Sequence, residues 1–553
     1  MANPSLQIGN DNWAIKEDNL LGYSTAGTRF VPQPITMTRA TLGTRVNPSG
    51  LVEDVELLGS EEVTGFTNGT TYPFSTFTTS GNNITSAIIS SSFAGAVSNS
   101  ISIVNGKTYK VTFTYTKNSG DDLRVLISNA ISGASVSISN IEQVSASGDI
   151  TLFLTATSTA TGYLQMGTGS GSDSLDISIT NISVKEATID NLPRVDYTDG
   201  TSSLLVEPQR TNLVTYSEDF SESGYGWNYT SDALELIELN SIVSPDGTQN
   251  ADKIAKTATR VYANAHSSQN IVSNQLYSWS MFIKEGTHSI GYLSLTQGDT
   301  EYKSYFDLNN ETSGMLSGSA TTKLEDFGNG WYKCTLSNIS STTDLSVRFD
   351  FGMSYSTTNA NWPSASEGNG LYMYYWGAQL EAGSYATSYI KTSGSTVTRN
   401  QETYTKTGIS DKINSEEGVL FLEMAALSND GTSRCISIFQ NGSNFIKFIY
   451  SASSNRVDFV AFSDGNVSCN ITKVISNTTE NTKFGLKWKV NDFALWIDGT
   501  EVGTDLSGDA PLGMDKMYFT DEGGSGNKFF GKVKQLQIFK TALSDSELAT
   551  LTT

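Results

Sequence analysis

Polar and bulky residues alternate with a period of two through nearly all of the 553-residue chain. Residues 108–115 (TYKVTFTY) show this pattern most clearly, and residues 277–283 repeat it. Such alternation is typical of β-strands with one buried and one exposed face. Clusters of turn-forming residues separate the strands, for example Asn118-Ser119-Gly120-Asp121 and Gly328-Asn329-Gly330. The chain is therefore predicted to be an all-β protein. A helix is indicated only at Ser544-Asp545-Ser546-Glu547, a capping box.

Two stretches with little strand pattern divide the chain into modules. Residues 188–210 mix proline, glycine and charged residues, and residues 393–406 are rich in serine and threonine. Each of the three longer segments that these stretches separate has the length of a two-sheet sandwich. The predicted organisation comprises a short irregular N-terminal segment (1–55), a β-sandwich (56–187), a linker (188–210) and two further β-sandwiches (211–395 and 396–553).

The first two predicted sandwiches share a plan, which indicates a weak internal repeat. Val104–Val111 in one and Val272–Trp279 in the other have a turn followed by a strand that starts at a tyrosine. Each module also ends on a strand that finishes in an acidic turn, at Ile182–Ala187 and at Trp376–Gly383. Modules of this pattern resemble carbohydrate-binding jelly rolls.

The charge balance narrows the class of partner. The chain has 35 Lys and Arg against 57 Asp and Glu, a net charge of −22, and no cluster of basic residues. Nucleic acids and anionic membrane surfaces both attract basic patches, so neither is an expected partner. The sequence shows neither the basic start and apolar core of a secretory signal nor an apolar run long enough to span a bilayer. We therefore expect a soluble protein without an export signal.

Cysteine and histidine are scarce. Cys334, Cys435 and Cys469 are predicted to be buried free thiols, with a Cys435–Cys469 disulfide as the alternative. The two histidines, His266 and His288, lie in no recognisable nucleophile motif and are predicted to be structural. Zinc and nucleotide chemistry are not expected, since metal-binding and phosphate-binding motifs are missing.

The densest aromatic stretch is Leu371–Trp376. Alternation places Tyr372, Tyr374 and Trp376 on one face of a strand, where they form a candidate glycan platform. The alternative is that this face packs inside the protein or against another subunit. Trp488 and Trp496, on either side of the Asn491-Asp492 turn, are further candidate glycan contacts. Trp279 and Trp331 are predicted to fill cores.

Carboxylates are the first candidates for catalytic groups, because glycosidases need a suitably spaced pair. Glu423 stands alone in its strand, and the adjacent pairs Glu61-Glu62, Glu416-Glu417 and Asp121-Asp122 fit solvated turns better. The chain is therefore predicted not to be an enzyme and to carry no catalytic residue. No cofactor is predicted, although residues 297–301 and 309–311 have oxygen ligands that suit a structural Ca²⁺.

Three phrases carry a resemblance to a known family. The first is Met37–Glu53 (MTRATLGTRVNPSGLVE), and the second, Pro193–Leu213, contains PRVDY and SLLVEPQRTNL. The third, Gln379–Arg399, contains QLEAG, ATSYI and TR. Together they resemble a cassette of tailed-bacteriophage virion proteins, typically tail-fibre or other surface-appendage proteins. The sandwich at 56–187 is inserted between the first phrase and the second.

The last module resembles the concanavalin A-like/laminin-G sandwich. The matching residues are Gly418–Glu423 as the first strand, Phe493–Gly499 in a central hairpin, and Gly531–Phe539 as the closing strand, with Ala542-Leu543-Ser544 at its exit. This fold hosts binding, structural and hydrolytic proteins, so it does not determine a function.

These resemblances imply a virion surface protein, a tail or head fibre, that is made in the host cytoplasm. The N-terminal segment is expected to contact other virion proteins, the chain to form a homotrimer, and the sandwiches to contact host-surface polysaccharide. Two alternatives remain open. One is a purely structural capsid or tail decoration protein, and the other is a polysaccharide depolymerase.

Overall fold

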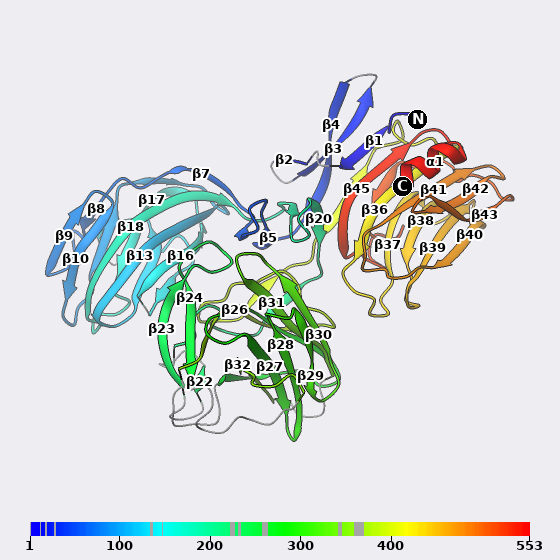
Figure 1. The fold of residues 1–553 in the computed structure, drawn as a ribbon. Helices are drawn as coiled ribbons and strands as arrows, with labels where there is room; N and C mark the ends of the chain where they lie inside the picture. Colours follow the sequence, from blue (N-terminus) through cyan, green and yellow to red (C-terminus); the bar gives the residue numbers. More distant parts are fainter. Residues whose placement is uncertain are drawn as a thin grey trace. The chain divides into compact units, whose positions relative to one another are not determined.

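The computed structural model describes most of the chain. The described residues are 2–10, 13–16, 19–26, 29–132, 137–145, 147–221, 227–229, 234–256, 264–340, 346–358 and 370–553. Within them the chain forms antiparallel β-sandwiches, which confirms the predicted fold class (Figure 1). Two compact units are distinguished: Glu56–Ile189, and Met1–Val55 together with Asp190–Thr553.

The predicted capping box starts the one helix of the described residues, α1 (Asp545–Thr552). Glu547 accepts a hydrogen bond from the backbone N–H of Ser544 at 3.0 Å, and the buried Leu548 holds the helix on the sandwich. In the described part of the chain, no helix is long and apolar enough to cross a membrane.

The unit Glu56–Ile189, here called the first sandwich, contains two sheets. One has the strand order β16 (Gly148–Thr155), β13 (Thr108–Gly120), β18 (Leu175–Thr188), β10 (Asn83–Ile89), β9 (Thr76–Ser80), with β7 (Leu57–Glu61) on β18. The other has the order β15 (Glu142–Val144), β14 (Leu123–Ser128), β17 (Ala160–Gly167), β11 (Gly95–Ser98), β8 (Phe66–Asn68), with β12 (Ile101–Ile103) on β17. The apolar faces of the two sheets enclose one core.

The middle sandwich also contains two sheets around one core. The first has the order β23 (Leu234–Ile242), β24 (Ala251–Lys256), β33 (Tyr372–Ala382), β26 (Leu276–Glu285), β31 (Trp331–Ser340), β30 (Thr321–Asp326). The second has the order β22 (Asn228–Tyr229), β25 (Asn264–Asn270), β32 (Ser346–Met353), β27 (Ile290–Gln297), β28 (Thr300–Asp307), β29 (Thr312–Ser317).

The first and middle sandwiches share one topology, as the internal repeat predicts. The sheet order β16-β13-β18-β10-β9 corresponds strand for strand to β31-β26-β33-β24-β23. Both central pairs contain a β-bulge at the same point, where Asn181 in one and Gly377 in the other have a positive φ. In both, a tyrosine hydroxyl accepts the backbone N–H five residues earlier: Tyr109 from Val104, and Tyr277 from Val272. This shared bulge aligns the two modules residue by residue.

The last sandwich is built from strands that lie far apart in the sequence. One layer has the order β43 (Thr500–Asp505), β42 (Phe493–Ile497), β41 (Thr482–Lys489), β36 (Glu417–Ala426), β45 (Gly531–Phe539), and β1 (Leu6–Gly9) and β20 (Ser203–Val206) both pair with β45. The other has the order β40 (Asn466–Val474), β39 (Arg456–Ser463), β38 (Asn444–Tyr450), β37 (Arg434–Asn441), β44 (Lys516–Tyr518), β35 (Thr403–Thr407), β4 (Arg29–Thr38), β3 (Asn19–Ala26), β2 (Ala14–Lys16).

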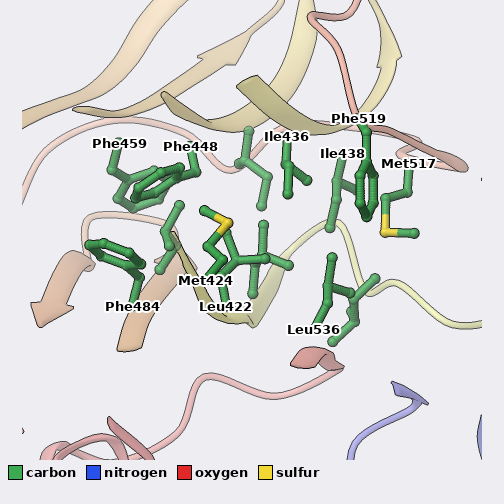
Figure 2. Packing of buried hydrophobic residues seen from close by; sticks show 14 of the residues in the cluster. Leu422, Met424, Ile436, Ile438, Phe448, Phe459, Phe484, Met517, Phe519 and Leu536 are labelled. Carbon is green, nitrogen blue, oxygen red and sulfur yellow. The ribbon is translucent and has the colours of Figure 1, made fainter. Parts of the chain in front are cut away.

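The two layers of the last sandwich enclose the largest buried cluster of the described residues. Figure 2 shows Leu422 and Met424 of β36 facing Phe448 of β38 and Phe459 of β39. Leu6, Ile8, Ile35 and Met37 of the N-terminal segment are buried in the same cluster. The segment 1–55 was expected to be irregular, but it contributes strands to this sandwich because its alternating apolar residues complete the core.

The two stretches that were predicted to be linkers contain short paired strands. In the first linker, β19 (Arg194–Asp196) pairs with β20, and β21 (Arg210–Asn212) pairs with β34 (Val397–Arg399) of the second. A further hairpin of β5 (Thr44–Val46) and β6 (Val52–Asp54) precedes the first sandwich. The chain enters and leaves that sandwich at one place, since Val55 N–H bonds to Gly43 and Asn191 N–H bonds to Arg39.

Candidate functional site

The aromatic strand β33 has the two faces that alternation predicts. Met373 and Tyr375 point into the core of the middle sandwich, while Tyr372, Tyr374 and Trp376 lie on the outer face of the sheet. Their accessibility differs, however. Tyr372 and Tyr374 are half-buried, and their ring centroids lie 5.5 Å apart, edge to face. Trp376 is fully buried.

The burial of Trp376 corrects the predicted three-residue platform. Its ring packs against Phe282 at a centroid distance of 5.2 Å and against Tyr389 at 4.5 Å. Val52 and Trp331 complete this cluster. Residues from the hairpin β5–β6 and from the loop after β33 therefore cover this half of the sheet face. The ring of Trp376 has no surface left to stack on a sugar.

The prediction that Trp488 and Trp496 contact glycan is also wrong, because both rings are buried. Trp488 on β41 is fully buried in the core of the last sandwich, and its indole N–H donates to the carbonyl of Asn414 at 3.1 Å. Trp496 on β42 points to the opposite face of the sheet, where Phe421 and Leu548 of α1 cover it. Both faces of this sheet are occupied, so neither ring is open to a ligand. Trp279 and Trp331 are buried, as predicted.

Two lysines flank the remaining tyrosine pair. In the strand register, Tyr374 lies between Lys253 of β24 and Lys284 of β26. The ammonium nitrogen of Lys253 is 4.5 Å from the ring centroid of Tyr372, within the range of a cation–π interaction. We call Lys253, Lys284, Tyr372 and Tyr374 the aromatic–lysine face. It is the open half of the outer sheet face of the middle sandwich.

Each of the two lysines has one polar partner that positions its ammonium group. The remaining N–H groups are available to donate to a ligand. Lys253 Nζ lies 3.5 Å from the carboxylate of Glu238, which is 56% exposed. Lys284 Nζ donates to the carbonyl of Asn329 at 2.6 Å. An ammonium group has three donors, so each lysine has further donors for a ligand. Burial and the neighbouring Tyr372 raise the pKa of Tyr374, so its phenol stays protonated at neutral pH.

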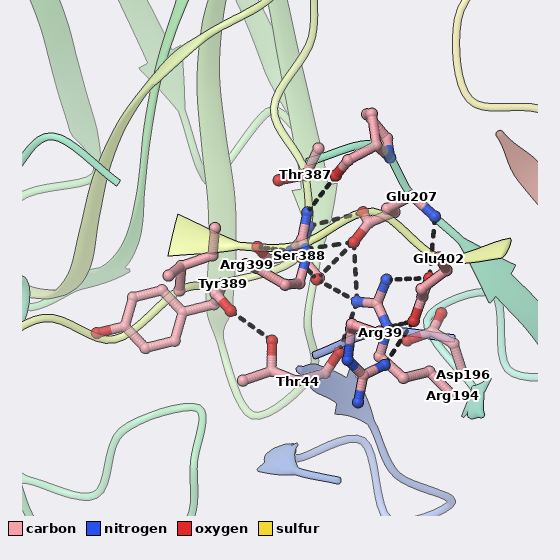
Figure 3. A network of polar contacts seen from close by, with 12 residues as sticks. Arg39, Thr44, Arg194, Asp196, Glu207, Thr387, Ser388, Tyr389, Arg399 and Glu402 are labelled. Carbon is pink, nitrogen blue, oxygen red and sulfur yellow. Dashed lines mark hydrogen bonds and ion pairs between the residues drawn. The ribbon is translucent and has the colours of Figure 1, made fainter. Parts of the chain in front are cut away.

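A buried ion network lies elsewhere in the same unit, as Figure 3 shows. Glu402 accepts hydrogen bonds at 2.6 Å from both Arg39 and Arg194. Glu207 pairs with Arg194 at 2.8 Å and with Arg399 at 3.1 Å. All five side chains are at most 4% exposed. We call these five residues the ion-pair joint.

The joint brings together the three phrases that carry the virion resemblance. Arg39 comes from the first phrase, Arg194 and Glu207 from the second, and Arg399 from the third. Ser388 of the third phrase donates its backbone N–H to Glu207 at 2.8 Å. The phrases are therefore one structural feature, in which segments that are distant in sequence close around buried charges.

The two carboxylates of the joint remain ionised at neutral pH. Burial would raise the pKa of Glu207, but the charges of Arg399 and Arg194 and the hydrogen bonds from Ser388 outweigh it and hold the pKa below its usual range. The pKa of Glu402 is lowered in the same way, with burial opposed by Arg194 and Arg39. Ionised carboxylates that are saturated with donors hold segments together and do not supply a proton.

A polar row on the opposite sheet of the middle sandwich was not found from the sequence. Strand register places His266, Asp350, Ser294 and Lys303 side by side on four strands. Lys303 is 3% exposed, and burial lowers its pKa to about 8. Its ammonium group lies 4.6 Å from the ring centroid of Tyr292. Ser294, Lys303 and Asp350 of this row are buried, and His266 is half-buried.

The other candidate residues have structural surroundings. Residues 297–301 and 309–311, the candidate Ca²⁺ ligands, form the turns of the hairpins β27–β28 and β28–β29. In the described residues, no group of three or more His, Cys, Asp or Glu is placed to hold a metal ion. Glu423 accepts hydrogen bonds from Asn481 and Gln535. The three cysteines are buried free thiols, as predicted.

A cleft of about 640 Å³ opens beside the ion-pair joint. Hydroxyl and amide side chains such as Thr335, Asn338 and Asn481 line much of it. Glu207 and Ser388 of the network in Figure 3 reach its wall. Apolar residues such as Val52, Leu205 and Phe327 also line it.

No family model matches this sequence. No curated protein matches it either. Among solved structures, the CBM40 module of Ruminococcus gnavus IT-sialidase bound to alpha2,3 sialyllactose is 17% identical, with a TM-score of 0.22, and the match covers 25% of this chain and 84% of that one. Domains LG4-5 of the mouse laminin alpha1 chain are 12% identical, with a TM-score of 0.18, and the match covers 50% and 86%. At these values the likeness assigns no ligand to this chain.

Sialidases are also among the similar structures, which corrects one prediction. Trypanosoma rangeli sialidase in complex with sialic acid is 10% identical, with a TM-score of 0.21, and the match covers 98% of this chain and 97% of that one. The sequence-based prediction that the chain is not an enzyme is therefore withdrawn. A match of this quality assigns no activity in its place.

Proposed function

We propose that this chain is a surface protein of a tailed-phage particle, a tail or head fibre, and that its middle sandwich attaches to host-surface glycan through the aromatic–lysine face. The observation that carries the attachment role is the pair Tyr372 and Tyr374, which remains open on a sheet whose other half is covered. The virion role is supported by the resemblance of the three phrases that meet at the ion-pair joint.

The geometry suits a sugar ring. One face of a pyranose carries C–H groups and is apolar, so it stacks on an aromatic ring, while its hydroxyl groups need polar partners. Tyr372 and Tyr374 present ring surface, and Lys253 and Lys284 place N–H donors at either side. Because the four residues stand on neighbouring strands of one sheet, they are held in place before a ligand arrives.

A flat face of this kind gives weak contact at each copy, so copy number supplies the affinity. We include a homotrimer in the proposal, with attachment to other virion proteins through the N-terminal segment and a location on the virion.

The proposal is tested by binding of the full chain to host cells and to a glycan array. The double substitution Tyr372→Ala/Tyr374→Ala should abolish binding. The control is Tyr72→Ala, which removes the 38% exposed tyrosine of a similar edge-to-face pair with Phe93 in the first sandwich. It should bind as the unsubstituted chain does.

Other outcomes would contradict the proposal in different ways. If the full chain binds no glycan even as a multivalent display, the attachment role fails and a structural decoration role takes its place. If mass spectrometry finds shortened glycan after incubation, the chain cleaves what it contacts, and its role is that of a depolymerase.

A further inference from the structure

The aromatic–lysine face contains two lysines and one neighbouring carboxylate, that of Glu238. Lysine and arginine number 35 against 57 acidic residues, yet two lysines flank one tyrosine here. Adjacent strands lie about 4.8 Å apart, so the backbones of Lys253 and Lys284 are about 10 Å apart with Tyr374 between them. A sugar ring stacked on Tyr374 would therefore lie between two strands that each carry a lysine.

The fold does not require a lysine at position 284. The shared β-bulge aligns Lys284 with Thr116 and Tyr374 with Ser178 in the first sandwich, where the same two strands pair in the same register. That sandwich forms the same sheet with neutral hydroxyl side chains at both positions. The charge of Lys284 is therefore not needed for the sheet to form, and it lies on the half of the sheet that stays open.

The polar partners of both lysines lie on the sides away from Tyr374. Glu238 holds Lys253 from the far side, away from Tyr374, because the register across the sheet runs Glu238, Lys253, Tyr374, Lys284. Lys284 Nζ donates to the carbonyl of Asn329, in the turn that precedes Trp331, the neighbour of Lys284 on the side away from Tyr374. A neutral sugar would accept hydrogen bonds from these ammonium groups, whereas an anionic one would also gain charge-assisted bonds, which are roughly twice as strong.

We infer that the aromatic–lysine face selects sugars that carry a carboxylate, so that the ligand is an acidic polysaccharide of the host surface. The sugar ring stacks on the tyrosine pair and its carboxylate bonds to Lys253 or Lys284. This inference rests on the proposed glycan attachment and names the class of glycan.

The test compares binding of the full chain to acidic polysaccharides and to their methyl esters, for example polygalacturonate, alginate and hyaluronan with their esterified forms. Esterification removes the charge and keeps the sugar ring. The acid form should bind at least about tenfold more tightly than the ester, since one charge-assisted hydrogen bond has that magnitude. Added salt should weaken binding of the acid form only.

The substitutions Lys253→Gln and Lys284→Gln should each lower affinity for the acid form about tenfold and leave the ester unchanged. The matched control is Lys323→Gln on the edge strand β30, a 66% exposed lysine that pairs with Glu325. It should bind as the unsubstituted chain does.

The failures of the two proposals are distinguishable. If acid and ester forms bind equally, or if only neutral glycans bind on the array, the selection for carboxylate is overturned while attachment through Tyr372 and Tyr374 stands. The selection is likewise overturned if Lys253→Gln and Lys284→Gln bind the acid form as tightly as Lys323→Gln does. If no glycan of either kind binds, the proposed function fails, and this inference fails with it.

Discussion

The first and middle sandwiches are one fold with two different outer faces. Their core positions match: Ile177 and Ile179 of β18 align with Met373 and Tyr375 of β33. Their outward positions differ, since Ser178 and Thr180 align with Tyr374 and Trp376. The inward residues maintain the sandwich in both modules. The outward residues decide what the sandwich contacts.

The outer face of the middle sandwich has two parts with different surroundings. Around Trp376 the face is covered by neighbouring segments of the same unit, and around Tyr374 it stays open. In the first sandwich the aligned positions are serine and threonine, which have no large apolar surface to bury. In the middle sandwich, the aromatic residue Trp376 is covered by segments of the same chain. The ligand face we propose is the part of the same sheet that stays uncovered, around Tyr372 and Tyr374.

The largest expected effect comes from the ion-pair joint, which the first sandwich lacks. Glu402→Ala leaves the guanidinium groups of Arg39 and Arg194 buried without their shared partner, which should cost about 3–5 kcal/mol of unfolding free energy. All eight tryptophans lie outside Glu56–Ile189. Urea unfolding followed by tryptophan fluorescence therefore reports only the unit that contains the joint.

The control for this prediction is Glu325→Ala, which removes the partner of an exposed lysine and should cost at most about 1 kcal/mol. The unfolding of the first sandwich, followed by circular dichroism, should not change with Glu402→Ala. A shift in that transition would show that the two units are not independent. Because the pKa of both Glu207 and Glu402 is lowered, the contribution of the joint is present at neutral pH and is lost in acid.

The second prediction concerns Asp252, which aligns with Ile84 of the first sandwich. Burial raises the pKa of Asp252 to about 7, against the hydrogen bonds from Asn240 and Phe220 N–H groups. A raised pKa in the folded state means that stability is lost as the pH rises through about 7. The middle sandwich should lose about 2 kcal/mol between pH 5.5 and 8, since one pKa unit corresponds to about 1.4 kcal/mol.

Tryptophan-monitored urea unfolding across this pH range checks the effect. Asp252→Asn should flatten the pH dependence, because the amide does not titrate. Glu207 and Glu402 are ionised throughout the range, and the Lys303 pKa of about 8 lies at its upper end. An unchanged slope in Asp252→Asn would assign the pH dependence to another group.

The third prediction tests whether the two sandwiches are equivalent in energy as well as in topology. Tyr109→Phe and Tyr277→Phe each remove the hydroxyl that accepts a backbone N–H, and each should cost about 1 kcal/mol. Hydrogen exchange of the peptides that contain Val104 and Val272 should become faster in the respective variant. If only one variant loses stability, the shared hydrogen bond has different roles in the two modules.

The smallest effect on stability is expected from transferring the open face. Ser178→Tyr with Thr116→Lys changes two outward positions of the first sandwich and should alter its unfolding free energy by about 0.5 kcal/mol or less. In a chain that also carries Tyr374→Ala, the transfer should restore weak binding to acidic polysaccharide, measured on the same polymers as above. Stable folding without any binding would show that further residues are needed.

The local pattern predicts much of this molecule. Alternation correctly places Tyr372, Tyr374 and Trp376 on one face, because side chains of a strand point to alternate sides irrespective of what lies around them. The repeat is also visible in the sequence, since the turn before Tyr109 and Tyr277 is encoded within a few residues. These features depend on neighbours along the chain.

Burial of a face and register between strands are not local. Trp376 is covered by Tyr389 and by the hairpin β5–β6, which no pattern around residue 376 reveals. The position of Lys253 and Lys284 beside Tyr374 depends on strand register. The alternation around Trp488 and Trp496 likewise does not show that both faces of their sheet are covered.

The pairing of β1 with β45 sets an order for biosynthesis. Leu6–Gly9 leaves the ribosome more than 500 residues before its partner Gly531–Phe539. At roughly 5–20 residues per second this interval lasts about half a minute to two minutes. The first and middle sandwiches can fold during that time, while Leu6 and Ile8 wait for the core that will bury them. Closure of the last sandwich thus depends on synthesis of β45, and a chain truncated before β45 would expose Leu6 and Ile8 to chaperones and proteases.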